Sequence, residues 1–320
     1  MRRLAARLGL PLMIVVAGCA PAGTGPTGPL PSDQDQDQDQ DPFDRRATAV
    51  AEGWRPGPGW STGYIPLQDP TLLIGEADFT PATQTAFQAG WYRKPADLPA
   101  RQPDSGTIRF PDGELRVPLV DADEAFRTLT NGVEPPSCPG AKKPEVPPPP
   151  APGGDPDGTV SSRPQGECVA LTISKVELGT APLHTNRGEA QVPAWLFTVE
   201  EIGAVVATTA VAPQAVGRVP DPVVPSDSAP EGLVAAQNII EVDGTRLAFR
   251  LGVGSCDSEI TPLVQEREDL VVVGGSVVRS TDVCDAMLKL EEVEVTLKEP
   301  LGTRPVLDAL TGAPLRVGGN

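Results

Sequence analysis

The chain has 320 residues, which is room for two domains, since a domain averages about 150 residues. Its formal net charge is −17, and its 38 prolines and 33 glycines far exceed its 26 lysines and arginines. Binding to nucleic acid depends on basic patches that neutralise phosphates, and the sequence contains none. We therefore expect no nucleic-acid partner, and short strands and loops rather than long helices.

The first 18 residues have the pattern of a secretory signal peptide. Arg2, Arg3 and Arg7 make the start basic, and residues 8–17 are then almost wholly apolar. An apolar stretch of about ten residues is too short for a permanent membrane span, which needs about 20. The sequence therefore predicts export and removal of residues 1–18.

The end of this leader is similar to the lipobox of bacterial lipoproteins, with Val16, Ala17 and Gly18 placed directly before Cys19. The resemblance implies a thioether-linked diacylglycerol on Cys19, with acyl chains such as palmitate, and cleavage just before this cysteine. Two acyl chains give stable membrane attachment, whereas one does not. An ordinary cleaved signal followed by an unrelated cysteine is the alternative. The expected location is the outer face of the cytoplasmic membrane, with the lipid on Cys19 as the membrane partner.

Residues 19–46 are predicted to be a disordered acidic tether. Asp and Gln alternate without a break from residue 33 to 41, so the segment has no apolar side chain to bury and repels itself. Calcium binding would need oxygens that converge on a folded loop, and this repeat is solvated instead. No metal or other cofactor is expected.

The first predicted module covers residues 47–212 and is α+β. A helix begins near Phe43 and ends at Gly53, and a second runs from Thr80 as N-cap to Gly90. A hairpin turns at Pro111–Gly113, and a third helix starts at Asp121. Within the module, residues 135–165 are rich in proline and are predicted to form a disordered loop.

From Cys168 onward the sequence is typical of β-structure. Strands are expected around the turn at residues 186–188, and residues 213–232 are predicted to be a linker. A β module follows over residues 233–320 and contains the Asp243–Gly244 hairpin signal. The predicted fold class is mainly β, with short antiparallel sheets, a sandwich-like arrangement and long Pro/Gly-rich loops.

Two strands show the same change of alternation. Residues 171–178 and 288–295 align without a gap, and in each the apolar residues change parity halfway, at Ser174–Lys175 and at Glu291–Glu292. A β-bulge inserts one extra residue into a strand, so the apolar residues after it alternate in the opposite phase. We therefore expect a bulge in each strand and two related β modules, with chance similarity as the alternative.

Besides Cys19, four cysteines remain. In an exported chain they predict two disulfides, with three connectivities open. Neighbouring cysteines fall in the same module, which favours Cys138–Cys168 and Cys256–Cys284. A zinc site is the rival, but the sequence has no Cys-x-x-Cys and a single histidine.

Motifs for catalysis are weak. Residues 59–63 match G-x-S-x-G, but a proline-rich stretch precedes them where a nucleophile elbow needs a buried strand. The base would be His184, which we expect in a surface loop. The tryptophans and tyrosines of the first module could stack on sugars, although so few aromatic residues are more easily explained by the core. We predict no enzyme.

Residues 192–199 and 299–308 resemble segments of uncharacterised exported lipoproteins of streptomycete-type actinobacteria, from about Thr48 to the end of the chain. That family has no assigned activity, so the resemblance assigns no functional residues. The expected function is a lipid-anchored extracytoplasmic protein with a non-catalytic binding or structural role, whose partner is an envelope protein or a glycan. The alternatives are an envelope-polymer hydrolase and a solute-capture lipoprotein.

Overall fold

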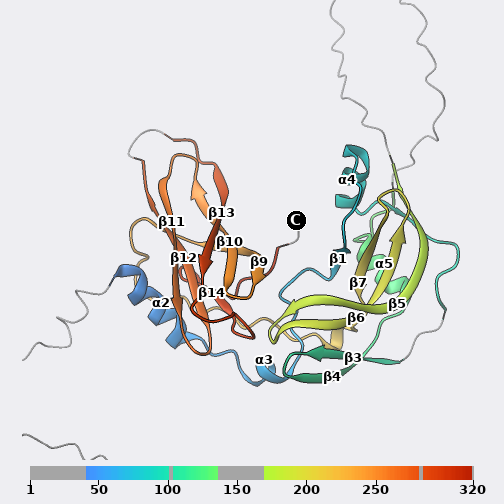
Figure 1. Cartoon of the computed structure of the whole chain (residues 1–320), viewed down its shortest axis with the longest axis horizontal. Helices are drawn as coiled ribbons and strands as arrows, with labels where there is room; N and C mark the ends of the chain where they lie inside the picture. Colours follow the sequence, from blue (N-terminus) through green and yellow to red (C-terminus); the bar gives the residue numbers. More distant parts are fainter. Residues whose placement is uncertain (1–40, 101–103, 136–168, 281–283, 319–320) are drawn as a thin grey trace, which may run out of the picture. The chain divides into compact units, whose positions relative to one another are not determined.

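The computed structural model describes residues 41–100, 104–135, 169–280 and 284–318. They belong to one compact unit, Asp41–Asn320, which is mainly β with mostly antiparallel sheets and few helices (Figure 1). The predicted fold class is therefore confirmed. The signal peptide, nearly all of the predicted tether and the proline-rich loop lie outside the described residues.

Three of the helices have side-chain N-caps, and those at Thr80 and Asp121 are the ones that the sequence predicts. Asp41 accepts a hydrogen bond from the Phe43 amide at the start of α2, and Thr80 forms a reciprocal capping box with Thr83. Asp121 accepts from the Glu124 amide at the start of the third. Residues 42–46, assigned above to the tether, are helical, because Asp41 caps the helix and its buried face already begins at Phe43. The helices are α2 (Pro42–Gly53), α3 (Pro58–Thr62), α4 (Pro81–Gln88), α5 (Ala122–Leu129) and the 3-10 turn η1 (Pro213–Ala215).

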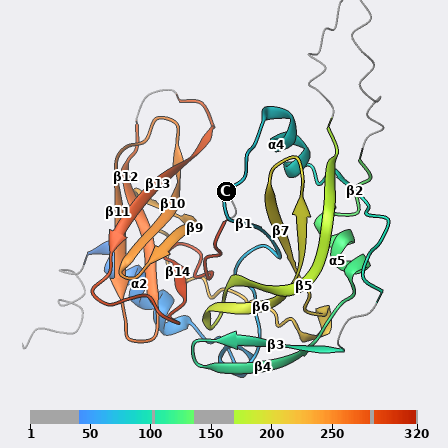
Figure 2. The same cartoon turned by 45° about the vertical axis from the view of Figure 1, so that its right-hand side comes forward.

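The larger sheet has seven strands. Its main path runs β1-β7-β6-β3-β4, and β5 pairs with both β6 and β2. The β5–β6 hairpin is the longest pairing and turns at residues 185–188, as predicted (Figure 2). The strands are β1 (Thr71–Ile74), β2 (Tyr92–Arg93), β3 (Ser105–Phe110), β4 (Gly113–Pro118), β5 (Leu171–Thr185), β6 (Gly188–Val199) and β7 (Ala204–Thr209).

The bulge predicted in residues 171–178 is present. The pairing of β5 with β6 shifts register between Ile173 and Lys175, so one residue is left over on β5. This lets Leu171 and Ile173 stay buried before the shift, while the strand continues along β6 after it.

Two smaller sheets make up the C-terminal part. One has the order β13-β10-β9, and the other has the order β11-β12-β14 with β8 also paired to β12. Between them lies a cluster of buried aliphatic side chains and Phe249. The strands are β8 (Leu233–Val234), β9 (Ala236–Asp243), β10 (Arg246–Gly254), β11 (Ser258–Glu266), β12 (Val271–Val278), β13 (Leu288–Thr296) and β14 (Val306–Asp308).

The bulge and the repeat predicted for β13 are wrong. β13 pairs with β10 in unbroken register from Leu288–Gly254 to Thr296–Arg246. The parity changes because Leu288 and Leu290 stay on the outer face of the sheet, 67% and 52% exposed, while Val295 points to the core. β5 lies in the seven-stranded sheet and β13 at the edge of another, so the two segments are not equivalent.

Helix α2 packs against the C-terminal sheets, and the same buried cluster includes Trp60, Ile65 and Leu67 of the first module. Phe43, Ala47 and Val50 are buried in one cluster with Val272 and Leu307. Arg46, 6% exposed, donates hydrogen bonds to the carbonyls of Asp227, Ala309 and Leu310 at 2.6, 3.2 and 2.8 Å. The predicted linker also makes backbone contacts, since the Gly217 amide donates to the Tyr64 carbonyl at 2.7 Å.

Candidate functional site

The predicted lipid site and one of the two predicted disulfides involve residues that the structure does not describe. Val16, Ala17, Gly18 and Cys19 are outside the described residues, and so are Cys138 and Cys168. Their assignment therefore stays a prediction from the sequence.

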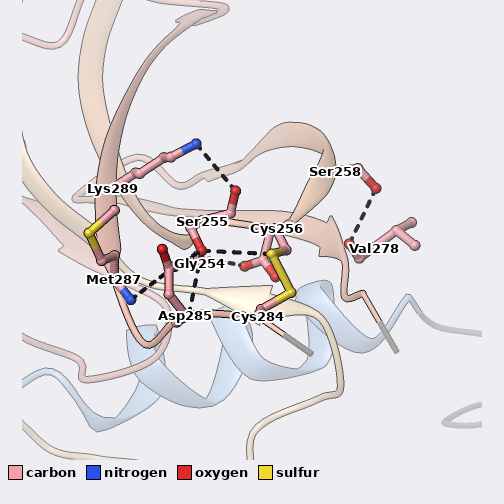
Figure 3. The surroundings of a disulfide bond; sticks show 10 residues. Gly254, Ser255, Cys256, Ser258, Val278, Cys284, Asp285, Met287 and Lys289 are labelled. Carbon is pink, nitrogen blue, oxygen red and sulfur yellow. Dashed lines mark hydrogen bonds between the residues drawn. A yellow bond between two sulfur atoms is a disulfide. The ribbon is translucent and has the colours of Figure 1, made fainter. Parts of the chain in front are cut away.

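The second disulfide is present. Cys256 and Cys284 are bonded, with their Cα atoms 6.1 Å apart, so the predicted pairing of these two cysteines is confirmed (Figure 3). The bond joins the turn after β10 to the segment that leads into β13. Both cysteines are exposed at the surface.

Polar side chains around the disulfide hold the same turns. Asp257 accepts a hydrogen bond from the Gly254 amide at 2.8 Å, and Asp285 accepts from the Ser255 hydroxyl and, at 3.4 Å, from the Met287 amide. Lys289 donates to the Ser255 carbonyl at 3.2 Å (Figure 3). Asp257 and Asp285 therefore hold the turns on either side of the disulfide.

Three apolar side chains next to the disulfide face solvent. Met287, Leu288 and Leu290 are 59%, 67% and 52% exposed, and we call them the edge patch. Leu288 and Leu290 are paired across the sheet with Gly254 and Gly252, which have no side chains to cover them. The patch is therefore a consequence of local sequence, with leucines on one strand and glycines on the next.

The rest of the outer face near the edge patch is charged. Arg250 pairs with Glu292 at 2.9 Å and Arg246 with Glu294 at 3.8 Å, both across the β10–β13 ladder. The outer face of β13 is thus apolar at Leu288 and Leu290 and charged at Glu292 and Glu294. The sequence did contain the signal for this surface, namely leucines out of phase with the core, but we interpreted it as a bulge.

One edge of β13 takes part in no strand pairing among the described residues, although β11 lies near it. In the described part of the chain, β13 pairs with β10 alone. The Met287 carbonyl accepts from the Ser255 amide, and the Leu297 amide donates to the Thr245 carbonyl, so odd-numbered residues bond to β10. Because successive residues alternate, the N–H and C=O groups of Leu288, Leu290 and Glu292 point to the open edge.

The G-x-S-x-G segment does not form a nucleophile elbow. It lies in α3, where the Ser61 hydroxyl donates to the Pro58 carbonyl at 3.3 Å, and Trp60 is buried with its ring 5.2 Å from that of Trp54. Asn186, in the β5–β6 turn, donates to the Trp60 carbonyl and accepts from the Ile65 amide at 2.8 Å. These contacts give the segment a structural role, which is to tie α3 to the hairpin.

His184 is in strand β5, not in a surface loop as predicted, because the strand continues to Thr185 before it turns. Its backbone amide donates to the Gln68 side chain at 3.0 Å, and its carbonyl accepts from the Leu67 amide at 2.9 Å. Burial lowers the pKa of its imidazole below the usual 6.5.

The aromatic residues of the first module are mostly core. Trp54, Trp60, Tyr64 and Tyr92 are between 2% and 9% exposed, and burial raises the pKa of both tyrosines. A platform that stacks sugars needs rings open to solvent. The core role that we favoured is the one these four residues have.

Two adjoining hollows share Pro56 and Arg218. The first, of about 220 Å³, lies beside Trp60 and Tyr64 and is lined also by residues 214–217. The second, of about 540 Å³, is lined only by Pro56 and residues 218–221. The charged side chains that line them are Arg218 and Asp221.

Among the described residues, no group of three or more His, Cys, Asp or Glu side chains is placed to hold a metal ion. The helices in residues 41–318 that the structure describes include none long and apolar enough to cross a membrane. Comparison of the chain with models of known families, with curated proteins and with solved structures finds no match.

Proposed function

We propose that this chain is a lipid-anchored extracytoplasmic protein with a non-catalytic binding or structural role in the cell envelope. The lipobox at residues 16–19 supports the anchor. The Cys256–Cys284 bond supports export, because disulfides form and persist mainly outside the reducing cytoplasm. Between Cys19 and Asp41 the chain can reach at most about 75 Å, at about 3.4 Å per residue, which sets the distance at which the body works from the membrane.

The edge patch is the observation that carries the binding role. Exposed apolar side chains that adjoin one another, rimmed by charges, are typical of surfaces that contact other proteins. An unpaired strand edge also offers backbone hydrogen bonds to a partner. In β13 both features coincide at Leu288 and Leu290.

The alternatives explain less of the structure. A hydrolase would need its nucleophile and base together, whereas Ser61 is bonded within α3 and His184 lies in β5 beside Gln68. A solute-capture protein would use the hollows at Arg218. The one beside Trp60, about 220 Å³, is smaller than the 300–1,000 Å³ typical of ligand pockets. The other, about 540 Å³, is of that size but is lined only by Pro56 and residues 218–221.

The anchor is tested by mass spectrometry of the mature amino terminus. We expect a chain that begins at Cys19 with a diacylglyceryl modification, and a Cys19→Ser variant that is neither lipidated nor retained with membranes. A matched control combines Cys19→Ser with Ser32→Cys, which returns a thiol to the tether but outside the lipobox. Lipidation of that control, or an unmodified wild-type terminus, would contradict the proposed anchor.

The binding role is tested by crosslinking in intact cells. Wild-type chain should give a specific crosslinked species, and Leu290→Lys should abolish it. Val242→Lys is the matched control, because Val242 is an exposed apolar residue on β9 of the same sheet but outside the edge patch. Equal loss in both variants would point to added charge rather than to the patch.

A further inference from the structure

We propose that the edge of β13 binds the same edge of a second copy of this chain, antiparallel, with Leu290 on the two-fold axis. This names a partner for the edge patch and so rests on the proposed binding role, but it does not depend on the lipid. Three features of β13 favour a second copy: the pattern of charges along the strand, its unpaired hydrogen-bonding groups and the position of its exposed leucines.

The register follows from geometry. A two-fold axis perpendicular to the sheet places residues of the same parity opposite each other, so it passes through a residue. With the axis at Leu290, the two Leu290 side chains meet, and Lys289 of each copy lies opposite Glu291 of the other. Met287 lies opposite Val293 and Leu288 opposite Glu292. No like charges oppose each other in this register.

Neighbouring registers are worse for the same strand. An axis at residue 288 places Asp285 opposite Glu291, an axis at 289 places Lys289 opposite itself, and axes at 291 or 292 place glutamates opposite themselves. Like charges directly opposite across two strands are destabilising, whereas opposite charges and apolar pairs are stabilising. The alternation of charge along Leu288–Glu292 therefore selects the Leu290 axis.

The free hydrogen-bonding groups fit this axis. The N–H and C=O groups of even-numbered residues face the open edge, as the bonds of Met287 and Leu297 to β10 require. Leu290 opposite Leu290 is then a hydrogen-bonded pair, and so is each pairing of Leu288 with Glu292. The carboxylate of Glu292 is already engaged by Arg250 at 2.9 Å, so it faces Leu288 with its charge balanced.

The pairing would also cover what the fold leaves open. Leu288 and Leu290 are exposed because Gly254 and Gly252 lie opposite them, and the second strand supplies side chains on the other side. Edge strands are commonly guarded by lysine and glutamate. In β13, Lys289 and Glu291 of one copy face Glu291 and Lys289 of the other in the Leu290 register. These charges therefore disfavour pairing with unrelated strands more than pairing with a second copy.

The test is site-directed disulfide trapping in the full-length mature chain in mild detergent. Cα atoms of a hydrogen-bonded antiparallel pair are about 5.5 Å apart, within reach of a disulfide. We expect Leu290→Cys to give a covalent dimer in most molecules on mild oxidation. Glu294→Cys is the control, since its two copies would be about 26 Å apart in this register and should stay monomeric.

Charge reversal tests the register independently by sedimentation. Lys289→Glu or Glu291→Lys alone should weaken self-association about tenfold, and the two changes together should restore it. Failure of Leu290→Cys to crosslink, equal crosslinking through Glu294→Cys, or no rescue by the double change would each overturn the proposal. If the amino terminus is lipidated but the chain does not self-associate, the proposed dimer is refuted and the anchor is not. If the chain self-associates but carries no lipid, the anchor is refuted and the dimer is not.

Discussion

Arg187 and Asp112 join the tips of two hairpins through a forked ion pair. The guanidinium Nη2 lies 2.7 Å from Asp112 Oδ1, and Nε lies 3.0 Å from both carboxylate oxygens. The same guanidinium lies 3.9 Å from the centre of the Phe110 ring. The Arg187 side chain is only 11% exposed, so its charge is largely removed from water and is compensated by Asp112.

Asp112→Asn is therefore expected to lower the free energy of unfolding by about 1–3 kcal/mol, because it leaves a largely buried guanidinium without its counter-charge. Chemical denaturation measures the change. Glu114→Gln in the same hairpin is the matched control, since its partner Arg109 and Glu114 are 65% and 64% exposed, and it should cost less than about 1 kcal/mol. Equal effects would mean that the fork contributes nothing beyond a surface pair.

Asp308 should make the free energy of unfolding depend on pH with the opposite sign to that of a typical carboxylate. It is 1% exposed, and burial raises its pKa even though Thr311 and the Ala236 amide donate hydrogen bonds to it. The folded state then holds the proton more strongly than the unfolded state. The free energy of unfolding should fall as pH rises from the unfolded pKa, near 3.8, to the raised folded pKa.

The variant Asp308→Asn removes this component, and it should also destabilise the fold by about 1–3 kcal/mol, because an amide NH₂ would face donors. The difference between wild-type and variant stability, measured between pH 3 and 7, isolates the effect. A difference that stays constant over that range would contradict the raised pKa.

His184 gives a separate and easily assigned titration, because it is the sole histidine of the chain. Burial lowers its pKa in the folded state, so the unfolded state binds a proton first as pH falls below 6.5. Stability from this residue should decrease from about pH 6.5 down to the folded pKa and then level off. NMR of the single imidazole gives the pKa directly, and a value at or above 6.5 would refute the prediction.

Removal of the confirmed disulfide by Cys256→Ala with Cys284→Ala should cost about 3–4 kcal/mol, since the bond closes a loop with a sequence separation of 28. Denaturant midpoints of the two forms measure the loss. Ser255→Ala, which removes a hydroxyl bonded to Asp285 but keeps the disulfide, is the control and should cost about 1 kcal/mol.

Local signals in the sequence predicted much of the fold. The caps at Thr80 and Asp121 and the turns at Asp112–Gly113 and Asp243–Gly244 need only neighbouring residues, and the structure has all of them. Strand β11 was not predicted, because its sequence carries Pro262 and charges and its side chains are only partly buried.

Long-range partners could not be predicted in this way. Asp308 is an ordinary acidic residue until Ala236 and Thr311 surround it. The edge patch was missed because we assumed that leucines in a strand are buried, and Gly252 and Gly254 on a separate strand decide otherwise. The function of a surface depends on such neighbours, and a single sequence does not show which residues become neighbours in the fold.

The guanidinium of Arg46 has a consequence for the order of events during synthesis. Its carbonyl partners come from residues 227, 309 and 310, so the start of the body cannot be completed until almost the last residue has been made. Contacts between such distant parts of a chain form slowly. For the export that we propose, this delay would be an advantage, because the amino-terminal helix lacks its packing partners until the carboxyl end has crossed the membrane.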